Sequence, residues 1–317
     1  MQKKNKQTVS VVIPTYNCPF LREAIDSVLR QTCLPDEIIV VDDGSLTKVE
    51  PLERYRGKVK YLYQENTGQA GARNLGVSNA IGDWVAFLDS DDLWNERKLE
   101  EQFTALFEFP DYGCVACGAV LINNLREPIG LGSGNFLGKT RPLTRLEFIL
   151  NAPNAILVPS MVVIKKEAFL KAGGFEAKFQ PIEDLVFFDK LLKSTDTLIV
   201  EKPLLFRRIH GDNLTFKYLG MLKSYLLWIS ERLERELTVD ELSKLKALVC
   251  EITGLSAYYK GKDSHGRILL KKALKYNPNL RRLLFFSLSI LGSTFGNYLR
   301  IIKRYFSSQT ARKILLK

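Results

Sequence analysis

The feature that most constrains the fold of this chain is a series of short, apolar, β-branched segments in its first hundred residues, each leading into a more polar stretch. We predict strands at 9–14, 37–41, 59–63 and 84–88, and helices at 21–31 and 71–79. Strands that are apolar on both faces and alternate with helices are typical of a parallel sheet covered on both sides. The sequence therefore predicts an α/β fold.

Polar clusters follow three of these strands, at 14–17, 42–45 and 89–92. Ligands of open α/β sheets bind in a crevice outside the carboxyl ends of the strands. We therefore expect these three clusters to face a single crevice.

The cluster at 89–92 contains three carboxylates, those of Asp89, Asp91 and Asp92. Such closely spaced carboxylates repel one another at neutral pH, so a cation is expected among them. Hard divalent ions bind carboxylate oxygens together with substrate phosphates. The alternative is an acidic N-terminus of a helix over 93–107, a role that Asp92 partly fits. Asp89 and Asp91 are less well explained by that alternative.

Two further acidic pairs each allow a chemical and a structural interpretation. Asp42 and Asp43 precede a glycine, which suits either a simple turn or acceptors for a base or ribose. Glu183 and Asp184 open a predicted helix at 183–193 among apolar residues. Burial there raises the pKa of a carboxyl group and makes it a better general base, whereas helix capping is the structural alternative.

Other motifs are weaker. The glycine-rich stretch 66–76 matches neither a dinucleotide fingerprint nor a Walker loop, but it places Arg73 toward the crevice. His210, one of two histidines, could bind a metal or diphosphate, although a lone loop histidine is more often structural. Cys114 and Cys117 lie in an apolar run without a second pair, so we predict no zinc or redox site.

The second part of the chain changes character. We predict strands at 114–122, 161–165 and 197–200, a flexible glycine-rich loop at 130–141, and helices from about residue 216 to the end, including a hairpin at 251–276. The sequence thus predicts a catalytic domain at 1–216 and a helical region at 217–317.

The C-terminal region is strongly basic. The net charge is +11, and residues 266–317 contain Lys and Arg but no Asp or Glu. With the apolar residues between them, these cations favour contact with an anionic membrane surface. The alternative is packing on the catalytic domain or on a second copy in a homo-oligomer. Binding of nucleic acid is not favoured, because no recognised module is visible.

The cysteine pattern and the N-terminus indicate the compartment. The five cysteines are odd in number and irregularly spaced, which fits a reducing environment. Residues 1–7 are polar and basic, unlike a secretory signal. We therefore expect a cytoplasmic protein that associates peripherally with the inner face of the plasma membrane.

The motifs taken in order resemble family 2 glycosyltransferases of the GT-A fold, a Rossmann-like, mixed and mostly parallel sheet flanked by helices, here with a C-terminal helical extension. The resemblance covers about residues 10–215. It rests on Val11–Asn17, Val40–Ser45, Asn66 through Gly76, Phe87–Asp92, Glu183-Asp184 and Arg208-x-His210. The chain departs from the family pattern at Pro181, Ile182 and Arg207.

The resemblance implies specific roles for these residues. It implies a nucleotide diphosphate sugar, with uracil the usual base, and Mn2+ or Mg2+ held by Asp89, Asp91 and His210. It implies that Asp184 is the catalytic base. The donor-binding residues that it implies are Pro14, Thr15, Tyr16, Asn17, Asp42, Asp43, Asn66, Gly68, Arg73, Asp89, Ser90 and Glu183.

The implied reaction is a single displacement that inverts the anomeric centre of the sugar. The acceptor would be a saccharide, free, lipid-linked or protein-linked, in cell-envelope polysaccharide or glycoconjugate synthesis. A sugar nucleotidyltransferase is the main alternative, although it usually has a basic, Gly-rich loop where this chain has Pro14–Asn17. A catalytically silent scaffold is the other alternative.

Overall fold

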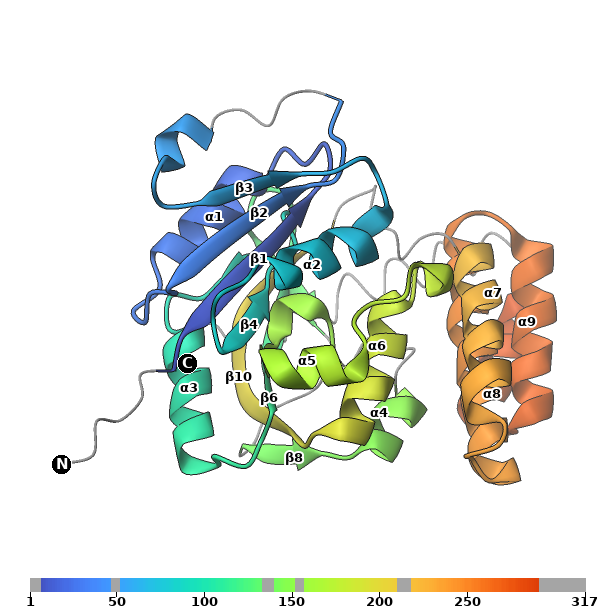
Figure 1. Cartoon of the computed structure of the whole chain (residues 1–317). Coiled ribbons are helices and arrows are strands. Elements are labelled where there is room, and N and C mark those ends of the chain that lie inside the picture. The colour runs from blue at the N-terminus through green and yellow to red at the C-terminus, as the bar shows by residue number, and fades with distance from the viewer. Residues whose placement is uncertain (1–6, 47–51, 133–139, 152–156, 210–217, 291–317) are drawn as a thin grey trace.

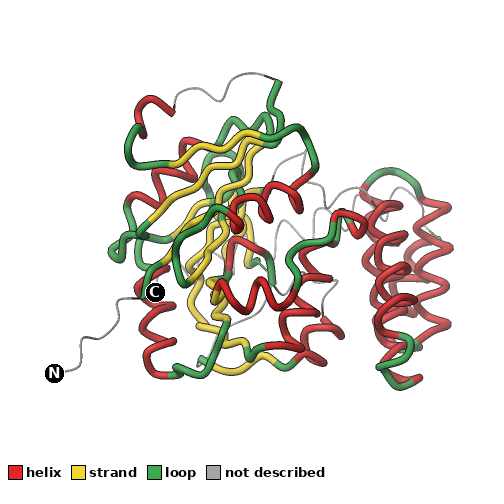
Figure 2. Tube along the Cα trace, in the orientation of Figure 1, coloured by secondary structure: helices red, strands yellow, loops and turns green. Residues whose placement is uncertain are grey.

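The computed structural model describes residues 7–46, 52–132, 140–151, 157–209 and 218–290 of the 317-residue chain. A single mixed sheet runs through the larger part of the molecule, and helices cover both of its faces (Figures 1 and 2). The strands follow the order β3-β2-β1-β4-β9-β6-β10-β5, with β7 beside β6 and β8 beside β10. Their bounds are β1 Val9–Thr15, β2 Glu37–Asp42, β3 Lys60–Tyr63, β4 Trp84–Phe87, β5 Leu93–Trp94, β6 Cys114–Ile122, β7 Pro128–Leu131, β8 Arg141–Leu143, β9 Val163–Lys165 and β10 Thr197–Arg208.

The first half of the sheet is parallel, as predicted. Strand β1 pairs in parallel with β2 and β4, and β2 pairs in parallel with β3. All residues of β1 and β4 are buried, because helices pack on both sides of them. Since parallel strands end at the same edge of a sheet, Thr15 and Asp42 lie side by side there.

The second half of the sheet is mixed. Strand β9 is antiparallel to both β4 and β6, whereas β10 runs parallel to β6. Strand β9 begins at Val163 rather than 161, because Pro159–Met161 form a 3₁₀ turn. The loop expected at 130–141 is partly strand, since β7 extends to Leu131 and β8 begins at Arg141; residues 133–139 lie outside the described residues.

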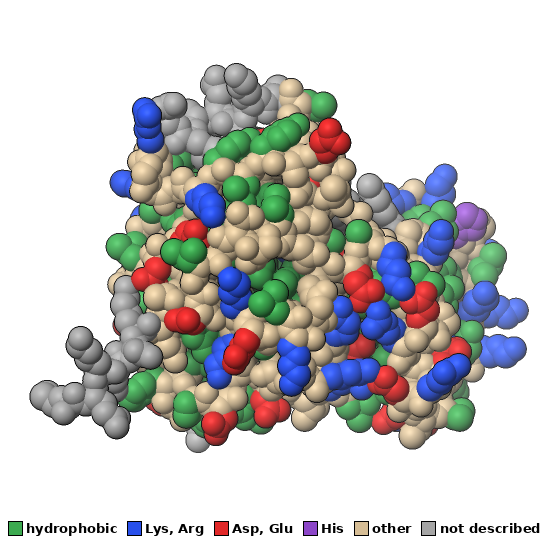
Figure 3. Space-filling view, in the orientation of Figure 1, with side chains coloured by type: hydrophobic (Ala, Val, Ile, Leu, Met, Phe, Trp, Pro, Cys, Tyr) green, Lys and Arg blue, Asp and Glu red, His purple; other side chains and the backbone are tan. Residues whose placement is uncertain are grey.

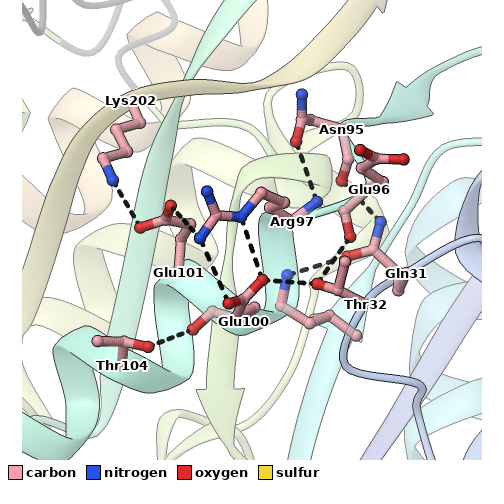
Figure 4. A network of polar contacts seen from close by, with 10 residues as sticks. Gln31, Thr32, Asn95, Glu96, Arg97, Glu100, Glu101, Thr104 and Lys202 are labelled. Carbon is pink, nitrogen blue, oxygen red and sulfur yellow. Dashed lines mark hydrogen bonds and ion pairs between the residues drawn. The ribbon is translucent and has the colours of Figure 1, made fainter.

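The prediction of a helix directly after the acidic cluster is wrong. The short strand β5 pairs with β10, a turn follows, and helix α3 begins only at Lys98. A polar network holds this turn against the end of the first helix (Figure 4). In it, Gln31 donates to the Asn95 carbonyl at 2.7 Å and accepts from the Leu99 amide at 3.0 Å. The acidic cluster is therefore not a helix N-terminus.

Ten helices of at least seven residues accompany the sheet in the described part of the chain. Their bounds are α1 Leu21–Leu29, α2 Gly68–Ser78, α3 Lys98–Glu108, α4 Arg145–Asn151, α5 Lys166–Ala172, α6 Glu183–Ser194, α7 Tyr218–Trp228, α8 Val239–Tyr259, α9 Asp263–Tyr276 and α10 Leu280–Ser289. The predicted hairpin is formed by α8 and α9, where Gly254 and Gly266 allow the two backbones to approach closely. Within the described ranges, no helix combines the length and apolar character needed to cross a bilayer.

The main hydrophobic core does not stop at residue 216. Tyr225 and Trp228 of α7 and Leu245 and Val249 of α8 are buried in the same cluster as the residues of β1 and β4. In Figure 1, α7 and α8 stand beside α6 and α4. The described start of the helical region is thus packed into the core of the α/β part. Cys114 and Cys117 lie in β6, as predicted, and both are buried and free.

Candidate active site

One cavity of about 690 Å³ opens at the carboxyl ends of β1 and β4. Its volume lies within the range of roughly 300–1,000 Å³ found for small-molecule sites. The strand-end clusters at 14–17 and 89–92 both reach it, as does the start of α6. The predicted site residues that line it are Pro14, Thr15, Tyr16, Asn17, Asp43, Asn66, Gly68, Arg73, Asp89, Ser90, Asp91, Glu183 and Asp184.

A buried arginine joins the two sides of this cavity. The guanidinium of Arg73 donates to Asp89 at 2.7 Å and to Glu183 at 3.3 Å, and its side chain is only 2% exposed. Burial acts to lower the pKa of Arg73, but the carboxylates of Asp89 and Glu183 outweigh it and hold that pKa above its ordinary value. Arg73 therefore ties the acidic cluster after β4 to the first turn of α6.

Asp184 lies next to this ion pair and is partly buried. Desolvation and the neighbouring charge of Glu183 raise the pKa of its carboxyl to about 7, against the opposing effect of Arg73 and Arg207. The residue before α6, Ile182, makes no side-chain cap, but Oδ1 of Asp184 accepts from the Leu185 amide at 2.8 Å, so Asp184 also serves the first turn of the helix. A carboxyl that titrates near neutral pH in a cavity is suited to general base catalysis.

The backbone of the acidic cluster is held by a second buried arginine. Arg208 donates from Nε to the carbonyl of Asp91 at 2.9 Å and from its own amide to Asp92 at 3.0 Å. Its remaining guanidinium nitrogens reach Glu23 and two backbone carbonyls, and the ring of Phe20 lies 4.1 Å from its centre. Burial, followed by the charges of Asp91 and Asp89, raises the pKa of Asp92 well above its ordinary range. The cluster thus concentrates negative charge on a fixed backbone.

The pair at the end of β2 has a structural role in this structure. Asp43 accepts from the amides of Thr67 and Gly68, each at 2.9 Å, and so holds the N-terminus of α2. Asp42 accepts from the Ser45 amide and from the Tyr61 hydroxyl, and it is not among the residues that line the cavity. Between them, Gly44 has a φ of +80°, which any side chain would disfavour. A direct contact of Asp42 with a base stays a prediction.

Three buried polar atoms of residues that line the cavity have no hydrogen-bond partner among the described residues: Oγ1 of Thr15, Nε of Arg73 and Oε2 of Glu183. The exposed fractions of these residues are 3%, 2% and 3%. An unpaired buried polar atom costs roughly 1–3 kcal/mol, so a ligand that bonds to it recovers that cost. Both sides of the cavity are therefore ready to contact a polar ligand.

Comparisons with known proteins agree with this geometry. The family model described as glycosyl transferase family 2 matches residues 10–173 of the chain. An uncharacterised glycosyltransferase of Rickettsia prowazekii is 30% identical over 242 residues, which cover 75% of this chain and 75% of that protein. The chain belongs to glycosyl transferase family 2.

Two further likenesses differ in extent. TuaG of Bacillus subtilis, provisionally assigned to teichuronic acid biosynthesis, is 38% identical over 109 residues, or 32% of this chain and 43% of that protein. The crystal structure of S. aureus TarS 1–349 in complex with UDP-GlcNAc has a TM-score of 0.63 at 18% identity, covering 96% of this chain and 92% of that one. The latter confirms that this glycosyltransferase has the GT-A fold.

The residues at the cavity show whether this glycosyltransferase has suitable ligands for the expected metal ion. Among the described residues, no three His, Cys, Asp or Glu side chains gather into a group that could hold a metal, and His210 lies outside those residues. Asp89 and Asp91 line the cavity together, and their charges add to the effect of burial in raising the pKa of Asp92. Two carboxylates completed by substrate phosphates are a usual way to bind Mg2+. The chemistry of these residues therefore fits a divalent cation shared with a diphosphate.

Some residues at the cavity were not predicted from sequence. They include Cys18, Gln69, Val158, Gln180, Met221 and Tyr225. Arg208 was noted only as part of a motif with His210, yet it fixes the acidic cluster. The sequence signal for Arg208 was its place two residues before that histidine; Met221 and Tyr225 had no signal, because only tertiary packing brings α7 to the site.

Proposed function

We propose that this glycosyltransferase is an inverting enzyme that transfers a sugar from a UDP-sugar, with Mn2+ or Mg2+, to a saccharide acceptor, free, lipid-linked or protein-linked, in cell-envelope synthesis. The observation that carries the proposal is the cluster in which Arg73 binds Asp89 on one side and Glu183, next to Asp184, on the other. The proposal is supported by the raised pKa of the Asp184 carboxyl and by the two carboxylates proposed to bind the cation, Asp89 and Asp91, which line the same cavity.

The donor assignment is supported by residues and by relatives. Thr15 and Glu183 each offer an unpaired polar atom to a ligand in the cavity. A TarS structure of the same fold was solved in complex with UDP-GlcNAc, and another was solved in complex with UDP. TuaG supports a cell-envelope acceptor.

The proposed mechanism follows from where the side chains lie. Asp184 accepts the proton of an acceptor hydroxyl as its oxygen attacks the anomeric carbon, and the bond to the diphosphate breaks on the opposite side. Because there is one displacement, the anomeric configuration inverts. A divalent ion on Asp89 and Asp91 would neutralise the charge of the departing diphosphate. Through its ion pairs with Asp89 and Glu183, Arg73 fixes the acidic cluster relative to the first turn of α6 during the step.

The experiment that tests this proposal is a panel of nucleotide sugars incubated with the purified protein and Mn2+, without added acceptor. Release of the nucleoside diphosphate from a UDP-sugar is expected, with water as acceptor. No release from any donor would overturn the enzyme assignment. Formation of a nucleotide sugar from UTP and a sugar 1-phosphate, with pyrophosphate released, would favour the nucleotidyltransferase instead.

The metal is tested separately by titration calorimetry with UDP and Mn2+. Asp91→Ala is expected to weaken metal-dependent UDP binding by about tenfold or more, because one of two carboxylate ligands is lost. Asp111→Ala, a substitution at an exposed carboxylate away from the cavity, serves as the control. UDP affinity that does not depend on Mn2+ in the native chain would contradict the metal assignment.

We propose in addition that the C-terminal helices contact an anionic lipid surface. Leu280, Leu283 and Leu284 of α10 are 85%, 48% and 55% exposed and lie on adjacent turns beside the basic Arg281. Figure 3 shows many Lys and Arg side chains, with Asp and Glu among them, over the helical part of the molecule in this view. Exposed leucines flanked by cations suit the interface of an acidic bilayer.

Flotation on phosphatidylglycerol vesicles tests this contact. The full chain is expected to float with the vesicles, and replacing the three α10 leucines by serine should reduce recovery severalfold. Leu125→Ser is the control, because Leu125 is 78% exposed and lies between β6 and β7, outside the C-terminal helices. Equal recovery of both variants would contradict membrane contact through α10.

A further inference from the structure

Asn74, the residue after Arg73 in α2, holds the turn between α5 and α6. Its Nδ2 atom donates to the Phe175 carbonyl at 2.9 Å, and its Oδ1 atom accepts from the Phe175 amide at 3.0 Å. The turn passes so close that a Cβ on Gly174, whose φ is +65°, would lie 2.7 Å from that Oδ1 atom. One amide side chain therefore binds both polar backbone groups of a single residue in this turn.

The ring of Phe175 packs on both elements that lead to the proposed catalytic groups. Its centroid lies 5.5 Å from that of Phe87, the last residue of β4, and 4.4 Å from that of Phe187 in α6. The guanidinium carbon of Arg73 lies 5.3 Å from the same ring centre, within the range of cation–π contacts. Because β4 leads into the acidic cluster and α6 begins with the proposed base, one ring contacts both sides and the arginine between them.

The same turn is fastened from the other direction by α6 and by the chain after α7. Lys190 donates to the Gly174 carbonyl at 3.1 Å and pairs with Glu176 at 3.0 Å. Arg232 also pairs with Glu176, at 2.8 Å. These contacts fix the turn to α6, and Asn74 fixes it to α2, the helix that carries Arg73.

The guanidinium of Arg73 depends on its neighbours for its orientation. Its two terminal nitrogens donate to Asp89, Glu183 and Gln69. Its Nε atom is buried and has no hydrogen-bond partner among the described residues. Packing on the Phe175 ring therefore helps to fix the plane of the guanidinium.

We propose that Asn74 is a positioning residue of this glycosyltransferase, which holds Phe175 and thereby keeps the guanidinium of Arg73 in its two ion pairs. The inference rests on the proposed function, in which Asp89 binds the cation and Asp184 is the base. Asn74 is not among the residues that line the cavity, so it acts through these neighbours.

The experiment compares Asn74→Ala and Phe175→Leu with the wild type. Phe175→Leu keeps the backbone groups that Asn74 binds but removes the ring. Asn79→Ala is the matched control, because Asn79 is also a partly buried asparagine of the α2 segment, but its amide donates to Leu75 at the end of its own helix. Hydrolysis of a UDP-sugar is measured from pH 5 to 9, and UDP binding with Mn2+ is measured by calorimetry.

Asn74→Ala is expected to lower turnover by about tenfold or more, because a displacement of about 1 Å can cost about 10²-fold in rate. Its acid limb should move to higher pH, since Arg73 opposes the rise in the pKa of Asp184 and would no longer be held near it. Mn2+-dependent UDP binding should weaken severalfold, because Asp89 loses its fixed partner. Phe175→Leu should move all three values in the same direction. The other charged or titratable groups that act on Asp184 stay in place, namely Glu183, Arg207 and Tyr225.

The outcomes separate this inference from the proposed function. An acid limb and a UDP affinity equal to those of Asn79→Ala in both variants would overturn the positioning role, even if their stability fell. If Asn74→Ala does not fold, Phe175→Leu alone makes the comparison. A wild-type chain that hydrolyses no nucleotide sugar would overturn the proposed function, and this inference with it.

Discussion

The two walls of the cavity are built in different ways. The wall near Thr15 and Asp89 comes from strand ends in the first hundred residues, and hydrogen bonds and ion pairs such as that of Asp89 with Arg73 hold its polar groups. The wall near Asp184 comes from α6 and α7, where the packing of Tyr225 and Trp228 is joined by hydrogen bonds from Ser224 to Gln180 and from Trp228 to Asp189. Polar residues that follow strand ends form motifs that can be recognised in a sequence. Residues that reach a cavity only through tertiary packing of helices form no such motif.

The largest effect is expected where the two walls meet, at Asp184. Asp184→Asn removes the proposed base but keeps the size of the side chain, so transfer should fall by about 10²–10⁴-fold. UDP binding, which we propose for the other wall, should stay close to that of the wild type. Steady-state kinetics and calorimetry on the same preparation check both values. Wild-type turnover in the Asn variant would remove Asp184 from the reaction.

The same substitution has a pH-dependent effect on stability. The carboxyl pKa is raised from 3.8 to about 7 in the folded chain, so ionising Asp184 costs stability as the pH rises through that interval. Asp184→Asn should therefore melt at a higher temperature than the wild type above pH 7. The difference should disappear below about pH 4, where both chains are neutral at this position. A pH-independent difference in melting temperature would contradict the raised pKa.

The next largest effect is expected from replacing Arg73, whose ion pairs connect the two walls. Arg73→Gln leaves Asp89 and Glu183 without their cation, which should lower the free energy of unfolding by about 3 kcal/mol. Arg97→Gln is the matched control, because Arg97 also pairs with two carboxylates, those of Glu100 and Glu101, but its side chain is 55% exposed. That variant should change stability by less than about 1 kcal/mol. Equal urea midpoints for the two variants would show that burial of the Arg73 pair does not matter.

A smaller effect is expected at Arg208, which supports only the polar wall. Arg208→Lys keeps the charge but loses the planar set of donors that reaches Asp91, Glu23 and the carbonyls after β6. We expect a loss of about 2 kcal/mol in stability and roughly tenfold weaker Mn2+-dependent UDP binding. A loss of stability with unchanged metal dependence would restrict Arg208 to a folding role.

The smallest effect is expected at Tyr61, whose hydroxyl donates to Asp42 at 2.7 Å. If Asp42 contacts the base, Tyr61→Phe should weaken UDP binding by a few-fold, since one hydrogen bond contributes about 1 kcal/mol. Calorimetry with UDP measures it. A change in stability without a change in affinity would mean that Asp42 acts only within the turn.

Much of the polar wall could be predicted from sequence because its geometry follows from local rules. The apolar runs fixed β1, β2 and β4 to within a residue or two at each end, and parallel pairing then brought 14–17 and 89–92 to one edge. Asp184 was expected at the cavity from its motif and is found there. These features need no knowledge of distant contacts beyond the pairing of neighbouring strands.

The features that could not be predicted depend on contacts between residues far apart in the sequence. A helix over 93–107 was part of the alternative interpretation of the acidic cluster, but Leu93 and Trp94 pair with β10, more than a hundred residues away. The contact of Asp42 with a base stays a prediction, and the hydrogen bond from Tyr61 of the edge strand β3 to its carboxylate has no signal in the local sequence. Nothing in the sequence of α7 shows that Tyr225 lies beside Asp184, since Ser224 and Trp228 anchor that helix through tertiary contacts.

The burial of Trp228 also limits which segments of this enzyme can be exchanged with those of a relative. Its indole bonds to Asp189 inside the main core, which continues through Leu245 to Val249. A chimera that joins the α/β part to the tail of a relative at residue 217 would cut through packed side chains. A junction after Val249 would keep those side chains but would divide α8, which runs from Val239 to Tyr259, so α7 and α8 are best exchanged together with the core.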